Sequence, residues 1–356
     1  MKKTLKVKLT PTKEQAKSLL ETIESFNDAC NWISRKSFEA GTPHQMKLHH
    51  MVYFEVRERF PALTSQMIVR AIAKVSGSYR TEKKTLHSFK RHSAMEYDKR
   101  LLSFKSLSHA SMATVHGRIT VSLIFGHYAP LDRNKMLGQA DLTTSGGKFF
   151  LNLLIDVPDG TPYDPEECLG VDAGIVHLST DSDGESFSGE GVDQVREKIH
   201  TLKKALQEKG TKNAKRHLKK VSGKEARFKK DTNHCLSKKI VSKAKGTGRG
   251  IALEDLKGFN GRTMVGKSQR ERFGKWAFDQ LRRFITYKAV LEGVPVVVVD
   301  PRNTSRTCSV CGHCEKDNRT SQGHFSCLRC THTEHADINA ARNIRFKAAI
   351  NRPIAV

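Results

Sequence analysis

Residues 308–344 read CSVCGHCEKDNRTSQGHFSCLRCTHTEHADINAARNI, a segment in which two CxxC pairs precede an acidic, alanine-rich run. Fifteen residues separate the pairs, which is within the spacing range of a zinc ribbon. Each pair can direct two thiolates at one tetrahedral ion. The segment therefore predicts one bound Zn²⁺ with four thiolate ligands: Cys308, Cys311, Cys327 and Cys330.

A further cysteine, Cys314, is an extra thiol that could compete for the ion. Gly312 directly follows Cys311 and permits the left-handed turn that directs backbone N–H groups at the thiolates, which favours Cys311 as the ligand. A site closed by four thiolates has no open position for substrate, so we expect the zinc to be structural. The nearby histidines then have no zinc-binding role; they are His313, His324, His332 and His335.

The composition indicates the class of partner. The chain carries a formal charge of +25 on 356 residues, and its sequence pI is near 9.8, which favours a polyanion as the main ligand. Residues 196–249 contain 19 Lys/Arg and 4 Asp/Glu, a net charge of +15. A solvated helical face would also explain a charge run, but one so dense favours contact with nucleic-acid phosphates. The candidate contacts are Lys203, Lys204, Lys215, Arg216, Lys219 and Lys220.

The sequence lacks the marks of a membrane or secreted protein. No window reaches the roughly 18 apolar residues of a membrane span, and no apolar signal segment follows the basic N-terminus. We therefore expect a cytoplasmic protein without a membrane partner. Thiols stay reduced in the cytosol, so the five cysteines near the C-terminus indicate metal rather than disulfides. The scattered Cys30, Cys168 and Cys235 are expected to be small core residues.

The N-terminal part of the chain begins with a strand and continues into helices. Leu5–Leu9 alternates apolar and basic residues as a strand does, and Thr10 followed by Pro11 is typical of a helix start. The apolar spacing of Thr64–Tyr79 predicts a second helix. Residues 80–115 are rich in Lys, His and Ser and have no firm assignment.

Two later segments, Ile119–Phe125 and Lys148–Ile155, have the residue pattern of strands and could pair with the N-terminal strand. This arrangement would make one β-domain that a helical insert interrupts. Prolines and a glycine at residues 158–165 then indicate a domain boundary. From about residue 166 strands alternate with helices, which favours an α/β fold.

Three acidic residues in this second unit could form one site. Cys168–Leu178 is expected to be a strand in which Asp172 lies between two glycines that leave room for an ion. The expected strand Gly250–Leu256 contains two adjacent acids, Glu254 and Asp255, and alternation lets only one of them join Asp172. If the apolar residues of the strand face the other layer, that acid is Glu254. Asp337 lies on a helical face with small alanines, which would let the helix approach the sheet.

Three carboxylates arranged in this way could hold two Mg²⁺ ions for phosphodiester cleavage. Each acid also has a simpler explanation. A lone strand Asp is often paired with a Lys, and an Asp in the first turn of a helix compensates the helix dipole. Asp255 is not expected to take part.

The motifs GVDAG around Asp172, ALEDL around Glu254 and HADINAARNI around Asp337 resemble the three acidic motifs of a RuvC-like nuclease of the RNase H fold. With TSRTCSVCG at Thr304–Gly312 between the second and third motifs, the chain resembles the TnpB family of transposon-encoded proteins, relatives of type V CRISPR effectors. The resemblance covers roughly residues 166–347.

The resemblance implies a prokaryotic, RNA-guided DNA endonuclease that is associated with the nucleoid when bound to DNA. A monomer is favoured, although the sequence does not determine the oligomeric state. Its partners would be a guide RNA derived from the transposon end and target double-stranded DNA beside a short motif. Asp172, Glu254 and Asp337 match the catalytic acids. The implied α/β multidomain fold has an RNase H-like RuvC domain with an inserted zinc ribbon, preceded by a β-barrel wedge domain with a helical recognition insert. The corresponding ranges are 1–10 and 116–165 for the wedge, 11–115 for the insert, 166–303 and 332–356 for the RuvC domain, and 304–331 for the ribbon.

Two other functions remain open on the sequence. A non-enzymatic zinc-ribbon regulator that binds DNA would explain the charge and the cysteines, but not the three acids. An unguided, structure-selective nuclease would explain the acids, but not the ribbon or the large N-terminal half.

Overall fold

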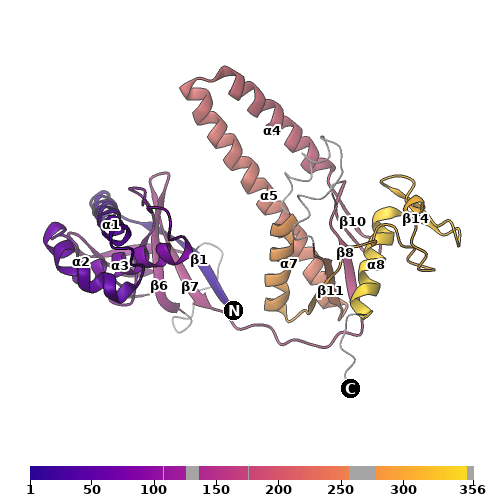
Figure 1. The fold of residues 1–356 in the computed structure, drawn as a ribbon, viewed down its shortest axis with the longest axis horizontal. Coiled ribbons are helices and arrows are strands. Elements are labelled where there is room, and N and C mark those ends of the chain that lie inside the picture. The colour runs from indigo at the N-terminus through magenta and orange to yellow at the C-terminus, as the bar shows by residue number, and fades with distance from the viewer. Residues whose placement is uncertain (107, 126–135, 175, 256–277, 351–356) are drawn as a thin grey trace. The chain divides into compact units, whose positions relative to one another are not determined.

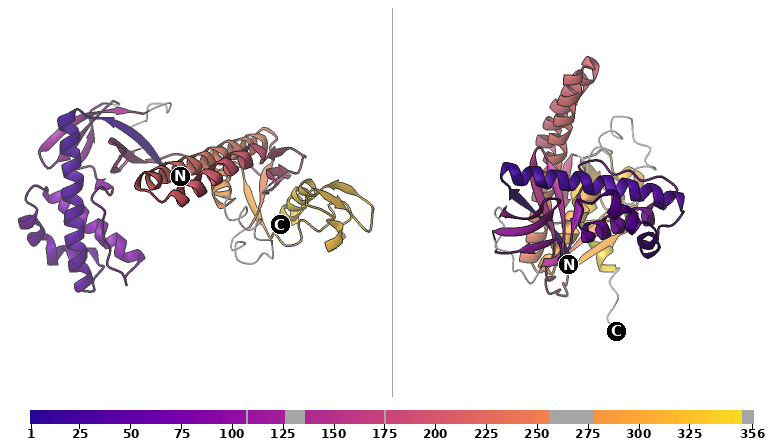
Figure 2. Two further views of the ribbon diagram at one scale, coloured as in Figure 1. Left: turned by 90° about the horizontal axis from the view of Figure 1, so that it is seen from above. Right: turned by 90° about the vertical axis from the view of Figure 1, so that its left-hand side faces the viewer.

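The structure is a computed structural model that describes residues 1–106, 108–125, 136–174, 176–255 and 278–350 (Figure 1 and Figure 2). The chain divides into two compact units, Met1–Val157 and Pro158–Val356, each with its own sheet. Two stretches of the RuvC-like domain expected from the sequence, 256–277 and 351–356, lie outside the described residues.

The first unit contains a seven-stranded antiparallel sheet in the order β2-β6-β7-β1-β5-β4-β3. The first strand pairs with β5 on one side and β7 on the other, as the sequence predicted, and its alternate residues Leu5, Val7 and Leu9 are buried. The strands are β1 (Lys2–Thr10), β2 (Met95–Tyr97), β3 (Leu102–Phe104), β4 (His109–Thr114), β5 (Gly117–Ile124), β6 (Met136–Ser145) and β7 (Lys148–Asp156).

This sheet curls until it is nearly closed. Its two edge strands, β2 and β3, follow each other in the chain and are joined only by residues 98–101, so the edges must lie close together. The Tyr97 hydroxyl of the edge strand β2 donates a hydrogen bond of 2.8 Å to the carbonyl oxygen of Ala113. Ala113 lies in β4, which is next to the opposite edge strand β3. A side chain thus bridges the two ends of the curled sheet.

Three helices pack on this sheet: α1 (Lys13–Glu39), α2 (Gln45–Arg59) and α3 (Ser65–Thr81). The predicted helix at residues 64–79 is confirmed, and Thr64 caps it by accepting a hydrogen bond from the Met67 N–H. The predicted start of the first helix at Thr10 is wrong. Thr10 still pairs with Ser122 in the sheet, whereas Thr12 and Gln15 exchange two hydrogen bonds in a capping box that begins the helix.

Strands β2, β3 and β4 come from residues that the sequence analysis counted with the helical insert. The helical part of the first unit therefore ends at Thr81. The polar composition of residues 80–115 concealed the strands, because all three are short and contain Ser, His, Glu or Thr beside their buried residues.

The second unit contains a five-stranded mixed sheet in the order β10-β9-β8-β11-β12. β8 and β12 both run parallel to β11, while β9 is antiparallel to β8 and β10. The strands are β8 (Cys168–Asp172), β9 (His177–Asp181), β10 (Ser186–Ser188), β11 (Gly250–Glu254) and β12 (Val296–Val299).

The single strand expected at Cys168–Leu178 is wrong, because the chain reverses between β8 and β9. Gly174 permits the reversal: a Cβ atom at this position would lie 2.7 Å from the carbonyl oxygen of His177. The expected return of the chain through Phe187 is present as β10.

Helices cover both faces of this sheet (Figure 1). Leu169 and Val171 of β8 pack with the apolar residues of α5 (Lys212–Gly246) and α7 (Phe278–Glu292). On the other face, Cys168 of β8 packs with α8 (Ala336–Ile350). Alternation along β8 therefore places Asp172 on the α8 side.

The helix α4 (Glu190–Lys209) and the first part of α5 form a long antiparallel hairpin (Figure 2). Gly210, in the left-handed conformation at φ 60°, ends α4, and the Thr211 side chain caps α5 by accepting from the Ala214 N–H. A small apolar cluster joins the two helices: Ile199, Leu206, Ala214, Leu218 and Val221.

Two of the three scattered cysteines lie in the core, as expected. Cys30 and Cys168 are buried, but Cys235 is exposed, because it lies outside the buried stripe of α5 that contains Leu236 and Ile240. Among the described residues, no helix is both long and apolar enough to cross a membrane.

Candidate active site

Asp172 and Glu254 end two neighbouring parallel strands. Val171 of β8 pairs with Leu253 of β11, so the next residue of each strand, an acid in both cases, lies beside the other. Leu253 packs on the α5 side of the sheet and Ala252 on the α8 side. Alternation therefore places Glu254 on the α8 side, as the sequence analysis expected.

Asp337 reaches these two acids from the first turn of α8, where it is 9% exposed. The helix can lie close to β8 because Gly170 has no side chain. A Cβ atom on Gly170 would stand 2.0 Å from the carbonyl oxygen of Ala341 and 2.8 Å from the backbone nitrogen of Arg345. Ala340 and Ala341 are both buried in this contact, as their small size predicted. The structure thus brings together the three predicted acids.

The electrostatics of Asp172 show that its carboxyl group senses the charges of the other two acids. Burial raises the pKa of Asp172 well above the usual carboxyl range, and the charges of Glu254 and Asp337 raise it further. Burial also raises the pKa of Glu254, although the Thr304 hydroxyl opposes this shift by donating a 2.6 Å hydrogen bond to the Glu254 carboxylate. The cluster carries more negative charge than its surroundings compensate.

Such a cluster suits hard divalent cations, which prefer carboxylate oxygens as ligands. A bound Mg²⁺ would favour the ionised form of each acid and remove the repulsion that raises the pKa of Asp172. Asp172, Glu254 and Asp337 are therefore the residues that could hold magnesium.

Arg319 was not identified from the sequence. It lies between the two cysteine pairs, and its Nη2 atom is 3.5 Å from the Asp337 carboxylate. The positive charge of Arg319 also lowers the pKa of Asp172 against the larger effects of burial and the other two acids. No local pattern marks this arginine, because only the fold of the cysteine-containing segment brings it to α8.

Asp255 lies outside the cluster, as expected. Its carboxylate forms an ion pair of 2.8 Å with Arg282 of α7, on the opposite face of the sheet from Asp337. It therefore provides an internal comparison for Glu254, since the two acids are adjacent in sequence but have different partners.

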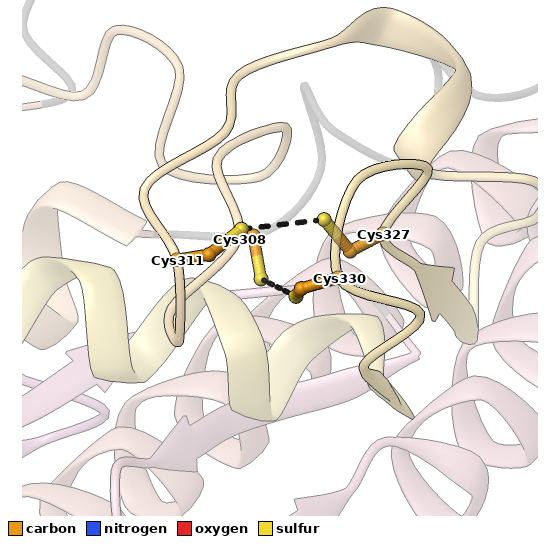
Figure 3. Close-up of side chains that lie close together, drawn as sticks. All are labelled: Cys308, Cys311, Cys327 and Cys330. Carbon is orange, nitrogen blue, oxygen red and sulfur yellow. Dashed lines mark hydrogen bonds between the residues drawn. The ribbon is translucent and has the colours of Figure 1, made fainter.

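The four predicted cysteines converge from two loops (Figure 3). The Sγ atoms of Cys308 and Cys330 are 3.7 Å apart, and those of Cys311 and Cys327 are 3.5 Å apart. Four sulfurs at about 2.3 Å from a tetrahedral zinc would be separated by roughly 3.8 Å. The cluster therefore fits one zinc ion.

Each cysteine pair forms the same kind of turn. The N–H groups of Gly312 and Thr331, the residues that follow the two pairs, donate to the carbonyl oxygens of Cys308 and Cys327. Both residues have positive φ, 73° for Gly312 and 60° for Thr331. The glycine adopts this conformation freely, whereas the β-branched threonine is strained.

The turns also direct N–H groups at the sulfurs. Burial alone would raise the pKa of the Cys327 thiol, but the backbone N–H groups of Cys330 and Arg329 lower it to about 6. Cys314 is exposed and does not belong to the four-sulfur cluster; instead it forms an isolated β-bridge with Thr307.

Two asparagines of α8 connect the cysteine-containing segment to the acids. Asn339 accepts a hydrogen bond from the Ser309 N–H and donates to the Thr307 carbonyl oxygen. Asn343 donates to the carbonyl oxygens of Thr304 and Thr307. The run DINAARNI thus supplies an acid, two anchors for the cysteine segment and two alanines for the close contact with β8.

The predicted phosphate contacts lie on the α4–α5 hairpin. Lys203 is ion-paired with Glu225 within the hairpin. The other five side chains are exposed, and their contact with nucleic acid stays a prediction; they are Lys204, Lys215, Arg216, Lys219 and Lys220.

Comparison with known proteins connects this site with named families. The family model of the Cas12f1-like TNB domain matches residues 278–344, which include the four cysteines and Asp337. InsQ of Escherichia coli (strain K12) is 30% identical over 223 residues, covering 57% of this chain and 54% of InsQ. A TnpB-like protein of Methanocaldococcus jannaschii is 35% identical over 162 residues, covering 45% of this chain and 55% of that protein.

Among solved structures, the Cas12f1 chain of a Cas12f1-sgRNA-target DNA complex matches with a TM-score of 0.66 at 16% identity. The match covers 93% of this chain and 83% of that chain, so the likeness extends to the fold of both units. In sequence, the chain spans about half the length of the curated relatives that it matches. The chain is thus similar in sequence to a TnpB-like protein and to InsQ, and similar in fold to Cas12f1.

Proposed function

We propose that the chain is an RNA-guided DNA endonuclease that cleaves target DNA by two-metal-ion hydrolysis of phosphodiester bonds. The nuclease centre would lie in the second unit, as an RNase H-like RuvC domain. The guided activity rests on the relatives, since the name of InsQ describes an RNA-guided DNA endonuclease and the Cas12f1 structure is titled as a complex with sgRNA and target DNA.

One observation carries the nuclease assignment: three carboxylates come together from two parallel strands and one helix, where burial, and after it the charges of Glu254 and Asp337, raise the pKa of Asp172. A protein gains no stability from such repulsion, so a bound cation is the natural reason for it. The sheet order, with β8 and β11 at the centre and β9 antiparallel, agrees with the RNase H-like fold that the sequence resemblance implies.

Asp172, Glu254 and Asp337 would hold the Mg²⁺ ions, which supply activation of water and stabilisation of the leaving oxygen when bound. Thr304 fixes the orientation of Glu254 through its hydroxyl group. Arg319 compensates part of the negative charge at Asp337 and presents a guanidinium group beside the site. A guanidinium in this place suits the phosphate of a bound strand, because it can donate two parallel hydrogen bonds.

The four cysteines would hold a structural zinc ion in a ribbon inserted into the nuclease domain. Zinc would order the segment that contains Arg319, and the asparagines of α8 would transmit that order to the acids. The small segment has few buried apolar residues of its own, Phe325 and Ala336 besides two cysteines, so the metal would supply much of its folding free energy.

The function is tested by purifying the protein from cells that contain its transposon and sequencing the RNA that copurifies. A discrete RNA species, and Mg²⁺-dependent cleavage of DNA complementary to it, are expected. Cleavage without any RNA would instead indicate an unguided nuclease, and DNA binding without cleavage would indicate a regulator.

Substitution of each acid by alanine tests the site. Asp172→Ala, Glu254→Ala and Asp337→Ala should each abolish cleavage and leave binding of guide and target largely intact. Asp255→Ala is the matched control, because it removes a neighbouring carboxylate that pairs with Arg282, and it should retain cleavage. Full Mg²⁺-dependent cleavage by Asp172→Ala would overturn the assignment.

The α4–α5 hairpin is proposed to bind nucleic-acid phosphates. Joint replacement of Lys215, Arg216, Lys219 and Lys220 by Gln should reduce the magnitude of the salt slope of binding by about 3 if all four contact phosphates. The effect should be similar for different guides, because phosphate contacts carry no sequence information. Lys203→Gln is the control, since Glu225 already engages that amine. An unchanged slope in the quadruple variant would exclude the hairpin as a phosphate-binding surface.

A further inference from the structure

Two histidines and one of the three acids form a second group of possible metal ligands. One ring nitrogen each of His177 and His335 and one carboxylate oxygen of Asp337 lie within 4.8 Å of one another. They come from three elements: the first residue of β9, the last residue of β14 (Thr333–His335), and the first turn of α8. The two imidazole rings lie edge to face, with centroids 5.2 Å apart and an interplanar angle of 71°.

The His177 side chain also has an unmet hydrogen-bonding requirement. Its Nδ1 atom is buried and has no hydrogen-bond partner among the described residues. A buried polar atom without a partner is destabilising, and such atoms in native proteins commonly mark a bound ion or a functional role. The lone pair of a neutral imidazole nitrogen is a good ligand for a transition metal.

His335 is also placed to become a ligand. Its Nδ1 atom accepts a hydrogen bond from the Asp337 N–H, and at 3.3 Å this bond is longer than the usual range. A backbone N–H donates this bond, so the bond requires a lone pair on the Nδ1 atom. A hydrogen bond of this length is weak, so little free energy is lost if the imidazole ring breaks it to bind an ion.

The chemistry of this group differs from that of the three acids. Carboxylates alone suit Mg²⁺, whereas two imidazoles with one carboxylate suit Co²⁺, Ni²⁺ or Zn²⁺. Ligand atoms bound to one such ion at about 2.1 Å stand roughly 3 to 3.5 Å apart. Side-chain rotations that bring the three atoms together by about an ångström would complete the site.

We propose that His177, His335 and Asp337 bind a first-row transition-metal ion at a site separate from the zinc cluster and sharing Asp337 with the magnesium site. Metal binding at this site does not depend on the proposed nuclease function. One consequence does rest on that function: an ion that occupies Asp337 from the histidine side would compete with Mg²⁺ and slow cleavage.

The test uses the full chain with its cysteine cluster loaded with zinc, which metal analysis verifies. Calorimetric titration with Co²⁺ should find binding beyond the zinc, with an absorption spectrum that lacks the thiolate-to-cobalt bands of a cysteine site. Because the three acids can also take Co²⁺, the variants and not the number of bound ions identify the histidine site. His177→Gln and His335→Asn should each weaken Co²⁺ binding at least about tenfold. Asn at position 335 retains an acceptor for the Asp337 N–H, so the start of α8 is preserved.

His324→Gln is the matched control, because His324 faces His335 in the strand pair β13 (His324–Ser326) and β14 but does not belong to the ligand group. It should bind Co²⁺ as the parent does. Equal Co²⁺ affinity in the parent, His177→Gln and His335→Asn would overturn the proposal. A loss of Co²⁺ binding in Asp172→Asn as large as in the histidine variants would also overturn it, because the ion would then belong to the three acids.

Cleavage assays separate this inference from the proposed function. In the parent, Co²⁺ at the concentration that fills the site should slow Mg²⁺-supported cleavage, and His177→Gln should resist this inhibition. If no variant cleaves DNA under any condition, the proposed function fails while the Co²⁺ titration still decides the metal site. If Co²⁺ inhibits the parent and His177→Gln equally, the competition at Asp337 is refuted.

Discussion

Gly170→Ala is the substitution that most directly tests how α8 delivers Asp337 to the other acids. The new Cβ atom would stand 2.0 Å from the carbonyl oxygen of Ala341, whereas ordinary contacts begin at 3.4 Å. Both close neighbours, the Ala341 oxygen and the Arg345 nitrogen, are backbone atoms, so no side-chain rotation relieves the clash. The helix must therefore move away from β8 by about 1.4 Å if the strand stays in place.

The displacement predicts two effects of different size. Overpacking of this kind destabilises a protein by about 1–3 kcal/mol, which corresponds to a Tm lower by about 2–12 °C for a unit of this size. Asp337 moves with the helix, and a displacement of about 1 Å can reduce catalysis about 100-fold. The loss of cleavage should therefore exceed what the lower stability explains at 25 °C, where the variant remains folded.

Calorimetry and single-turnover cleavage measure the two effects. Gly191→Ala is the control, because a Cβ atom there has no neighbour within 4 Å and the residue lies in α4 of the same unit. It should melt no lower than the parent and cleave equally well. If Gly170→Ala retains both the Tm and the cleavage rate of the parent, α8 does not approach β8 as closely as the structure indicates.

Four other substitutions test the acids and the zinc cluster. Asp172→Asn should stabilise the Mg²⁺-free protein, measured as the free energy of unfolding, at neutral but not at acid pH. The pKa of Asp172 is raised in the folded protein, so its carboxyl group stabilises the fold fully below the ordinary carboxyl range. This stabilisation is lost as the pH rises through the raised pKa. Parallel profiles of unfolding free energy against pH for parent and variant would contradict this. Thr331→Gly should slow zinc release to a chelator, because it relieves roughly 1–2 kcal/mol of strain at a φ of 60°, and faster release would disprove the strain. Cys308→Ser should lower the zinc content of the purified protein, whereas Cys314→Ser should not. If metal analysis shows the reverse, Cys314 and not Cys308 is the zinc ligand.

The sequence predicted the features of the site that depend on short local patterns. The alternation of apolar residues in β11 was enough to separate Glu254 from Asp255, because the period of a strand is two. Small residues on one face of α8 predicted its close approach, although the partner glycine was not identified. Gly170 was noted only as a neighbour of Asp172, whereas its contact with Ala341 depends on a helix about 170 residues away.

Features that depend on tertiary structure could not be read in this way. Arg319 belongs to a polar loop with no periodic pattern, and only the folding of the cysteine segment brings it to Asp337. The reversal between β8 and β9 was missed because CLGVDAGIVHL is apolar apart from Asp172 and His177, so its composition does not separate one long strand from two short ones. His177 was not noticed for the same reason, since its place beside His335 requires that reversal.

The position of α8 in the chain also governs when the site can exist during protein synthesis. Asp172 and Glu254 emerge from the ribosome well before Asp337, which follows Asp172 by 165 residues. The curled sheet of the first unit and both strand acids can therefore fold while the third carboxylate is still absent. Under the proposed function, a nascent chain would be unable to cut nucleic acid during this interval, and a translation product that ends before α8 would lack the third carboxylate.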